Sequence, residues 1–182
     1  MGTPREPKPV KLFVALLACH EELFPSVAGG LSALFGPIDS ASQTAPWSVT
    51  DYYEREMGSG LLRRFLSFAP LISPDGLAEI KLKTQGVEQN YQRAEGGGRT
   101  RRRVNIDPGY LDAGKVVLAS TKSAAHRIYL SSGIYGEATL LYYDGSFRPF
   151  AYTYPDYVWP EAEAFFRASR SRYLEQLKQT RE

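Results

Sequence analysis

The basic side chains of this sequence are concentrated around one short segment, Arg99-Thr-Arg-Arg-Arg-Val-Asn-Ile-Asp-Pro-Gly-Tyr110. Guanidinium groups bind phosphate and carboxylate through paired hydrogen bonds, so a run of arginines favours an anionic ligand. Between residues 99 and 127 the only acids are Asp107 and Asp112. The basic residues of the same stretch are Arg99, Arg101, Arg102, Arg103, Lys115, Lys122 and Arg127. This excess of positive charge predicts a site for a nucleotide or another phosphorylated small molecule, with an RNA segment as an alternative partner.

Three other residues of the segment could take part in such a site. Asn105 and Tyr110 could orient the ligand. Asp107 and the proline after it can cap a helix that begins near residue 109, and the free N–H groups of that helix would attract an anion. We interpret Asp107 as this cap, next to the ligand, rather than as a catalytic acid. In the alternative interpretation, the arginines lie on a solvated strand edge and discourage pairing with other sheets.

Carboxylates alternate in a second segment, Asp51-Tyr-Tyr-Glu-Arg-Glu56. In a strand, alternate residues share one face. Two carboxylates on one face could hold Mg²⁺ through oxygen ligands. They could also pair with Arg63 and Arg64 on the next strand, and this second interpretation is favoured.

A third candidate is Glu137, which lies inside the otherwise apolar run of residues 134–143. A buried carboxylate needs a partner or water. His126, Arg127 or Lys122 could face Glu137 across a hairpin. The pair would act as a base, as a ligand-binding group or as a structural ion pair, and the structural role is favoured.

These carboxylates define a second hypothesis for the function, an enzyme that acts on a phosphorylated substrate. Asp51, Glu56 or Glu137 would be the acid-base or Mg²⁺-binding group, and His126 would carry protons. Mg²⁺ is the one cofactor that the sequence indicates. The chain has two histidines and one cysteine, which are too few ligands for a zinc site.

Several catalytic motifs are absent from the sequence. There is no Gly-x-x-x-x-Gly-Lys-Ser/Thr phosphate loop, no Gly-x-Gly-x-x-Gly after a strand and no Gly-x-Ser-x-Gly elbow. Cys19 ends an apolar run, so we interpret it as a core residue rather than a nucleophile. The motifs therefore do not decide whether the protein is an enzyme.

The composition is that of a globular chain. The 182 residues predict one domain, residues 1–182, and the formal net charge is only +2. A single cysteine predicts a reducing, cytoplasmic location. No stretch approaches the length of a membrane span, so no membrane contact is expected. Residues 1–9 are polar and proline-rich, which predicts a flexible segment without a secretion signal. The oligomeric state cannot be inferred.

The first half of the chain predicts the order strand, helix, strand, strand, helix, strand, as in ferredoxin-like proteins. The apolar run at residues 10–19 is typical of a buried strand, and the helical spacing of residues 21–35 ends at Gly36. For residues 78–84 a strand competes with the second helix. The elements expected are strands at 10–19, 47–57, 61–69 and 101–106, helices at 21–35 and 75–93, and a flexible loop at 94–100.

The second half predicts hairpins and a final helix. Turn residues at 131–133 and 144–145 separate apolar segments, and aromatic residues recur at helical spacing near the C-terminus. Residues 109–122 fit a helix, with a strand at 115–120 as the alternative. The elements expected are strands at 126–130, 134–143 and 147–152, a linker at 153–157 and a helix at 160–178. The fold predicted is α+β, a mostly antiparallel sheet with helices on one face.

Aromatic residues gather between residues 129 and 159. Core packing explains many of them, but an exposed group would bind a protein partner. The third hypothesis is therefore an interaction module without catalytic activity.

Several strings resemble those of an uncharacterised bacterial and archaeal family of unknown function, whose members are about this long. The resemblance implies no established activity and no catalytic residues. Some members are labelled "GTP-binding protein", although this chain lacks the phosphate loop. The strings include Thr50-Asp-Tyr-Tyr-Glu, Arg102-Arg-Val-Asn-Ile-Asp-Pro-Gly-Tyr-Leu111, His126-Arg-Ile-Tyr-Leu130, Gly133-Ile-Tyr-Gly-Glu-Ala-Thr and Thr153-Tyr-Pro-Asp-Tyr157.

Overall fold

The computed structural model describes residues 2–95 and 99–179, without the side chains at positions 51, 55, 95 and 99. Its helices are α1 (Leu23–Phe35), α2 (Glu54–Met57), α3 (Leu77–Gln89) and α4 (Pro160–Gln179), with 3₁₀ turns at Asp51–Tyr53, Pro74–Gly76 and Pro155–Val158. Its strands are β1 (Val10–Ala18), β2 (Ile38–Ala41), β3 (Ala45–Pro46), β4 (Leu62–Ile72), β5 (Arg93–Glu95), β6 (Arg99–Arg101), β7 (Val104–Leu111), β8 (Lys115–Ser120), β9 (Ile128–Ser131), β10 (Ile134–Tyr143) and β11 (Ser146–Pro149).

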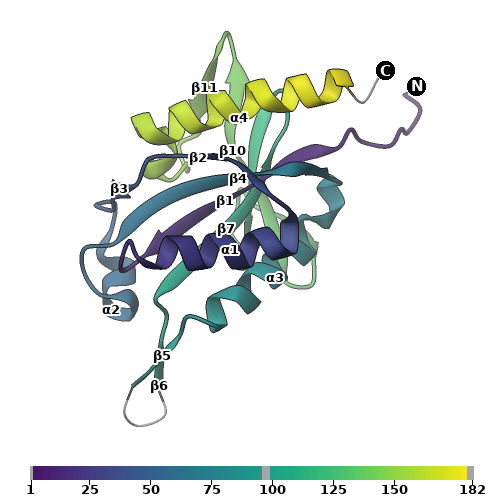
Figure 1. Cartoon of the computed structure of the whole chain (residues 1–182). Helices are drawn as coiled ribbons and strands as arrows, with labels where there is room; N and C mark the ends of the chain where they lie inside the picture. Colours follow the sequence, from purple (N-terminus) through teal and green to yellow (C-terminus); the bar gives the residue numbers. More distant parts are fainter. Residues whose placement is uncertain (1, 96–98, 180–182) are drawn as a thin grey trace.

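Within these residues nine strands form one antiparallel sheet in the order β11-β10-β8-β7-β1-β4-β2, with β3 beside β4 and β9 beside β10. Helices α1 and α3 lie on one side of the sheet, and α4 lies on the other (Figure 1). The predicted α+β class is confirmed. No helix among the residues described is both long enough and apolar enough to cross a membrane.

The central strand β1 explains why the sheet is covered on both sides. All nine of its residues are buried. Leu12, Val14 and Leu16 pack with α1 and α3, whereas Phe13 and Ala15 pack with α4. The expectation that all helices share one face is therefore wrong, because an apolar run without alternation has two faces to bury.

The N-terminal half has the predicted ferredoxin-like arrangement. Strands β7, β1, β4 and β2 lie in that order, with α1 and α3 as the two connecting helices. The helix predicted at residues 75–93 is α3, which is shorter (Leu77–Gln89), and the competing strand does not form. The second strand of the unit is β2, which the sequence did not indicate.

The strand predicted at residues 47–57 is wrong. This segment contains a 3₁₀ turn and α2. The hydroxyl Oγ1 of Thr50 accepts a hydrogen bond from the N–H of Tyr52 at 3.1 Å, which favours a helical turn over an extended chain. Gly58, with a φ of 88°, ends α2.

The helix predicted at residues 109–122 is also wrong, and the alternative strand at 115–120 is confirmed as β8. Asp112 forms the turn into β8, because its Oδ1 accepts hydrogen bonds from the N–H groups of Gly114 and Lys115 at 2.7 and 2.8 Å. Asp107 therefore lies in the middle of β7 and caps no helix. The helix N-terminus expected near residue 109 does not exist, because this segment is part of β7.

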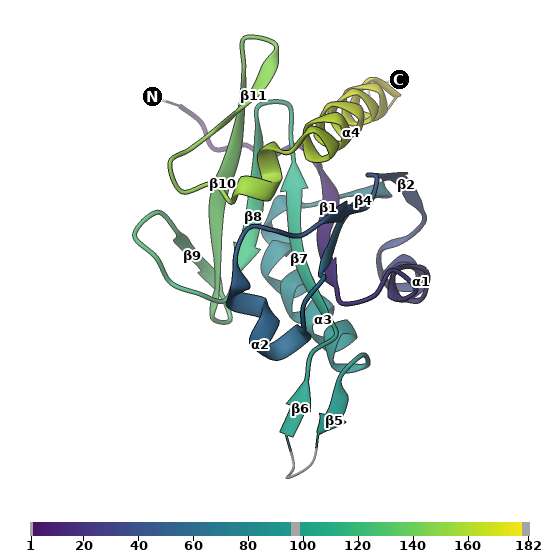
Figure 2. The same cartoon turned by 90° about the vertical axis from the view of Figure 1, so that its left-hand side faces the viewer.

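The strand predicted at residues 101–106 is divided, because β6 ends at Arg101 and β7 begins at Val104. The predicted loop at 94–100 has β5 and β6 on its flanks, which pair as a small hairpin, and residues 96–98 lie outside the described part. Both figures show this hairpin projecting from the body (Figures 1 and 2).

The C-terminal elements agree with the sequence. The β9–β10 hairpin turns at Ser132 and Gly133, and the β10–β11 hairpin turns at Asp144 and Gly145, all four with positive φ. Paired positive φ values are typical of tight hairpins. Strand β11 is shorter than expected, and the predicted linker contains the 3₁₀ turn at Pro155–Val158.

Gly109 is expected to be intolerant of a side chain. A Cβ atom there would lie 2.4 Å from Cζ of Phe13 and 2.4 Å from the carbonyl oxygen of Val117. The oxygen belongs to the paired strand β8 and cannot move freely. Gly109→Ala should therefore lower the free energy of unfolding by about 2 kcal/mol, measured by urea denaturation.

Gly29 provides the matched control, because no atom lies within 4 Å of a Cβ built there and the residue is exposed in α1. Gly29→Ala should raise the free energy of unfolding by up to about 1 kcal/mol. A Gly109→Ala protein as stable as the parent would contradict the tight packing of β7 against Phe13.

Candidate functional site

A cavity of about 280 Å³ lies where β7 and β8 separate. The two strands pair only between Gly109–Leu111 and Val116–Leu118 among the described residues. Beyond these pairs they diverge, with α3 on one side and α2 on the other (Figure 2). The basic residues that line the cavity are Arg63, Lys81, Arg102, Lys122 and Arg127, its carboxylates are Glu88 and Asp107, and its aromatic residues are Trp47, Tyr52, Tyr53, Tyr154 and Tyr157.

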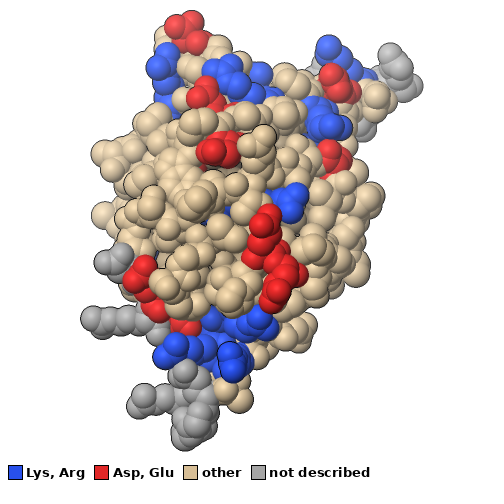
Figure 3. Space-filling model, turned by 60° about the vertical axis from the view of Figure 1, so that its left-hand side comes forward, with Lys and Arg blue, Asp and Glu red and all other residues tan. Residues whose placement is uncertain are grey.

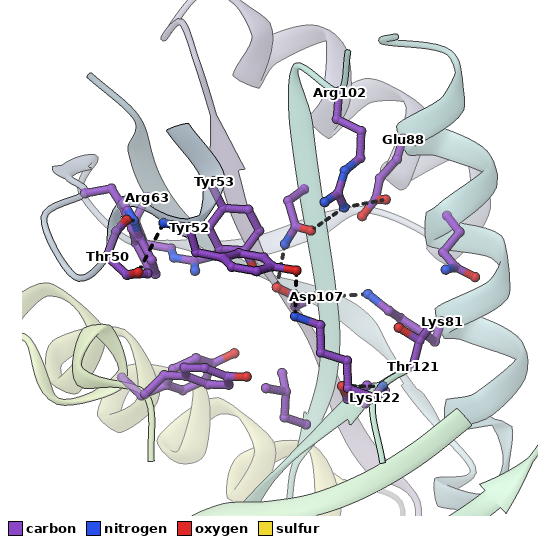
Figure 4. Close-up of a pocket in the computed structure, with 18 of the residues that line it drawn as sticks. Thr50, Tyr52, Tyr53, Arg63, Lys81, Glu88, Arg102, Asp107, Thr121 and Lys122 are labelled. Atoms are coloured by element: carbon purple, nitrogen blue, oxygen red, sulfur yellow. Dashed lines mark hydrogen bonds and ion pairs between the residues drawn. The ribbon is translucent and has the colours of Figure 1, made fainter. Parts of the chain in front are cut away.

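The lining residues come from two sides. Lys81 and Glu88 reach in from α3, whereas Tyr52 and Arg63 lie opposite them, with Asp107 of β7 between (Figure 4). Asn105 and Asp107 are two residues apart on β7, so their side chains leave the strand on the same side. The cavity therefore depends on elements that are distant in the sequence.

A continuous set of hydrogen bonds begins at Arg102. Its Nε and Nη2 donate to the two carboxylate oxygens of Glu56 at 2.5 and 2.6 Å, and its Nη1 donates to Oδ1 of Asn105 at 3.0 Å. Asn105 Nδ2 donates to Oδ2 of Asp107 at 2.6 Å. Lys81 Nζ donates to Oδ1 of Asp107 at 2.9 Å. These bonds fix the side chains of one wall in place.

The two carboxyl groups of the cavity have opposite pKa shifts. Burial raises the pKa of Glu88 to about 7, although Lys81 and a hydrogen bond from the N–H of Ile106 act against this. Burial would also raise the pKa of Asp107, but the cations of Lys81 and Arg63 outweigh it and hold that pKa below its usual range. Neighbouring carboxyl groups with separated pKa values are typical of functional sites.

Arg63 is a buried guanidinium group at the cavity, only 4% exposed. Its Nε lies 2.9 Å from Oδ2 of Asp156, close enough for an ion pair but without hydrogen-bond alignment. Its Nη1 has no hydrogen-bond partner within the part of the chain that the structure describes. The guanidinium carbon lies 4.7 Å from the ring centroid of Trp47. Buried donors without partners are rare in proteins and indicate a missing acceptor.

Arg127 joins the cavity to the β9–β10 hairpin. Its Nε donates to Oε2 of Glu137 at 2.6 Å, and its Nη2 donates to the hydroxyl of Tyr154 at 3.1 Å. Nε2 of His126 lies 3.0 Å from the same Glu137 oxygen, and the imidazole stacks on Tyr152 with ring centroids 4.0 Å apart. Glu137 is thus held in an ion pair behind the cavity wall.

The model of one protein family, described as a domain of unknown function (DUF4416), matches residues 8–173. The chain belongs to the DUF4416 family. No curated protein and no solved structure matched the chain. The DUF4416 match includes every residue that lines the cavity, so the cavity lies within the family domain.

The structure of the DUF4416 domain brings together only part of the predicted anion site. Arg102, Asn105, Asp107, Lys122 and Arg127 line the cavity. Arg101 and Arg103 do not line it.

Two other predicted residues lie at a different place. Tyr110 and Lys115 border an open depression near Tyr173 and Leu177, where Lys115 is hydrogen-bonded to Asp112. The expectation that Lys115 converges with the arginines is wrong, because Tyr110 and Lys115 are at the paired ends of β7 and β8, away from the separation.

The predicted catalytic carboxylates are also separated. Glu56 reaches the cavity wall only through Arg102, and Glu137 and His126 lie behind Arg127. The side chain of Asp51 is outside the described residues. Among the residues that the structure describes, no three metal-binding side chains gather at one point.

Sequence reasoning missed Arg63, Lys81 and Glu88. A signal for two of them was present, because Leu77, Lys81, Thr84 and Glu88 recur at the spacing of one helix face and all are buried. Charged residues at core positions of a helix predict a partner inside the fold. Arg63 gave no such signal.

One face of the molecule carries side chains of both charges (Figure 3). On the face shown in Figure 3, Lys and Arg side chains gather at the lower end, with Asp and Glu side chains above and beside them.

Three successive residues of β9 expose apolar side chains to solvent: Ile128, Tyr129 and Leu130. Tyr143 and Tyr154, also in the C-terminal half, are exposed as well.

Proposed function

We propose that this DUF4416 domain binds a phosphorylated small molecule, with a nucleotide as the leading candidate, in the cavity between β7, β8, α3 and residues 47–53. The single observation that carries the proposal is the buried guanidinium of Arg63, a residue that lines the cavity and whose Nη1 has no acceptor among the described residues. A phosphate oxygen is the kind of acceptor that such a donor prefers.

The charge of the cavity supports an anionic ligand. Five basic side chains line it, against the two carboxyl groups of Glu88 and Asp107. Lys81 and Arg102 are already hydrogen-bonded to carboxylates. Lys122 donates one hydrogen bond, to the hydroxyl of Tyr52 at 3.2 Å, and an ammonium group has three donors. Lys122 and Arg63 are therefore the two cations best able to donate hydrogen bonds to a phosphate.

The aromatic residues support a ligand with a ring. Trp47, Tyr52 and Tyr154 line the cavity next to the basic groups, and aromatic side chains stack on nucleotide bases. A volume of about 280 Å³ is close to the lower end of ordinary ligand pockets. This size favours a small molecule over an RNA segment.

Thermal shift measurements test the proposal. The probes are inorganic phosphate, ribose 5-phosphate, AMP, GMP, ATP and GTP, with adenosine as the uncharged comparison. We expect phosphorylated probes to raise the melting temperature and adenosine to have no effect. Lys122→Ala should weaken binding about ten- to a hundredfold, because one charge-assisted hydrogen bond contributes about 1.5–3 kcal/mol.

The matched control is Lys83→Ala. Lys83 is an exposed lysine of α3 that pairs with Glu79 at 2.8 Å and does not line the cavity. The Lys83→Ala protein should bind the probes as the parent protein does. The proposal fails if no phosphorylated probe raises the melting temperature, or if Lys122→Ala and Lys83→Ala bind equally well.

A further inference from the structure

Glu88 is a buried carboxyl group that lines the cavity described above. We propose that the cavity takes up one proton together with its anionic ligand, and that the carboxyl group of Glu88 holds this proton. The inference rests on the proposed function, because it concerns the same cavity and the same phosphate-bearing class of ligand.

Glu88 is fixed at the cavity and cannot turn toward bulk solvent. Its side chain is 8% exposed, and its Oε1 accepts a hydrogen bond from the N–H of Ile106 at 2.6 Å. Its Oε2 lies 3.8 Å from Nη1 of Arg102, within ion-pair distance but too long for a hydrogen bond. A ligand in the cavity therefore meets a carboxyl group that stays where it is.

The cations near Glu88 are shared with other carboxylates. Arg102, from the segment before β7, makes both of its short ion-pair contacts with Glu56 of α2. Lys81, on the same helix as Glu88, is bound to Asp107 of β7. The three carboxyl groups of Glu56, Asp107 and Glu88 thus share Arg102 and Lys81, and Asp107 is also stabilised by the charge of Arg63. Glu88 is the member of the set without a counter-ion of its own.

Binding of an anion increases the excess of negative charge near Glu88. A phosphate in the cavity adds negative charge near a buried carboxylate, and like charges in a poorly solvated site disfavour ionisation. Protonation of Glu88 makes its carboxyl group neutral and so removes the repulsion between this group and the bound anion. Burial already raises the pKa of Glu88 to about 7, so the proton is available near neutral pH. Ligand binding and proton uptake are then one coupled equilibrium.

The coupling has a definite sign. Below the pKa of the free protein, Glu88 is already protonated and the anion binds at full strength. Above it, binding must include uptake of a proton, and affinity falls as the pH rises. A ligand that raises the pKa of Glu88 by one unit changes the affinity by about tenfold across this range.

Sulfate is a suitable probe, because it carries two negative charges over the whole range from about pH 6 to pH 9 and does not itself titrate. Sulfate is added at constant ionic strength, and binding is followed by tryptophan fluorescence, since Trp47 lines the cavity. We expect the dissociation constant of the parent protein to be about tenfold higher at pH 8.5 than at pH 6.0.

Two variants test whether the carboxyl group of Glu88 is the group that takes up the proton. Glu88→Gln keeps an oxygen acceptor for the N–H of Ile106 and carries no charge, so it should bind sulfate equally at both pH values. Glu79→Gln is the matched control on α3, because its side chain is 70% exposed and lies outside the cavity. It should keep the tenfold pH dependence.

Each outcome decides the inference. Equal sulfate affinity at both pH values in the parent, or an unchanged pH dependence in Glu88→Gln, would overturn proton uptake and leave phosphate binding intact. Absence of sulfate binding at both pH values would also overturn it. The thermal shift screen with nucleotides then decides the proposed function separately.

Discussion

Replacing Asp156 by leucine is expected to lower the free energy of unfolding by about 3–5 kcal/mol. Asp156 is fully buried in the 3₁₀ turn before α4, and it is the ion-pair partner of Arg63. The guanidinium of Arg63 does not lose its proton, so the variant would leave a buried positive charge without a carboxylate. Urea denaturation at pH 7 measures the loss.

A double variant separates the pair from the packing around it. Arg63→Met combined with Asp156→Leu removes both charges, and it should recover most of the stability, because apolar replacements of buried ion pairs are often neutral. Glu163→Ala breaks an exposed pair with Arg167 on α4 and should change stability by no more than about 0.5 kcal/mol. A double variant as unstable as Asp156→Leu would show that the unpaired charge is not the cause.

The second large effect concerns Glu88 and pH. Compared with Glu88→Gln, the parent protein should lose about 2.5 kcal/mol of unfolding free energy between pH 5 and pH 8. Burial raises the pKa of Glu88 in the folded protein to about 7, from 4.5 in the unfolded chain. Between these values the folded protein holds a proton that the unfolded chain has released, so stability falls as the pH rises.

Urea denaturation of both proteins at a series of pH values measures this difference. It should be small near pH 5, grow as the pH approaches 7 and become constant above pH 8. Glu79→Gln should follow the parent at every pH, because the Glu79 carboxylate is exposed. A constant difference between Glu88→Gln and the parent would show that Glu88 titrates as an ordinary surface carboxyl group.

Both effects arise at the same cavity. Arg63 and Asp156 place a pair of charges in the interior, and Glu88 adds a carboxyl group that weakens the fold at neutral pH. Features that cost stability are commonly retained where they serve binding. The cavity is therefore the part of the DUF4416 domain in which stability and the proposed function are expected to oppose each other.

The sequence alone determined the elements whose signals are local. The apolar run of β1 needs no distant residue to identify it as a buried strand, and the turns at Ser132-Gly133 and Asp144-Gly145 fix two hairpins through their own backbone preferences. The aromatic stripe of α4 also predicts its helix. Periodicity and turn chemistry act over a few residues, so the sequence carries them directly.

Tertiary structure decided the rest. The pattern of residues 109–122 fits both helix and strand, and that of residues 47–57 predicts a strand, but the folded chain contains β8 in the first segment and α2 in the second. Arg102 is 46 residues from Glu56, and Lys81 is 26 residues from Asp107. Such pairs form only because the ferredoxin-like order of strands brings α3 beside β7, where β7 and β8 separate. Charge was visible in the sequence, but the partner of each charge depends on topology, which local patterns do not encode.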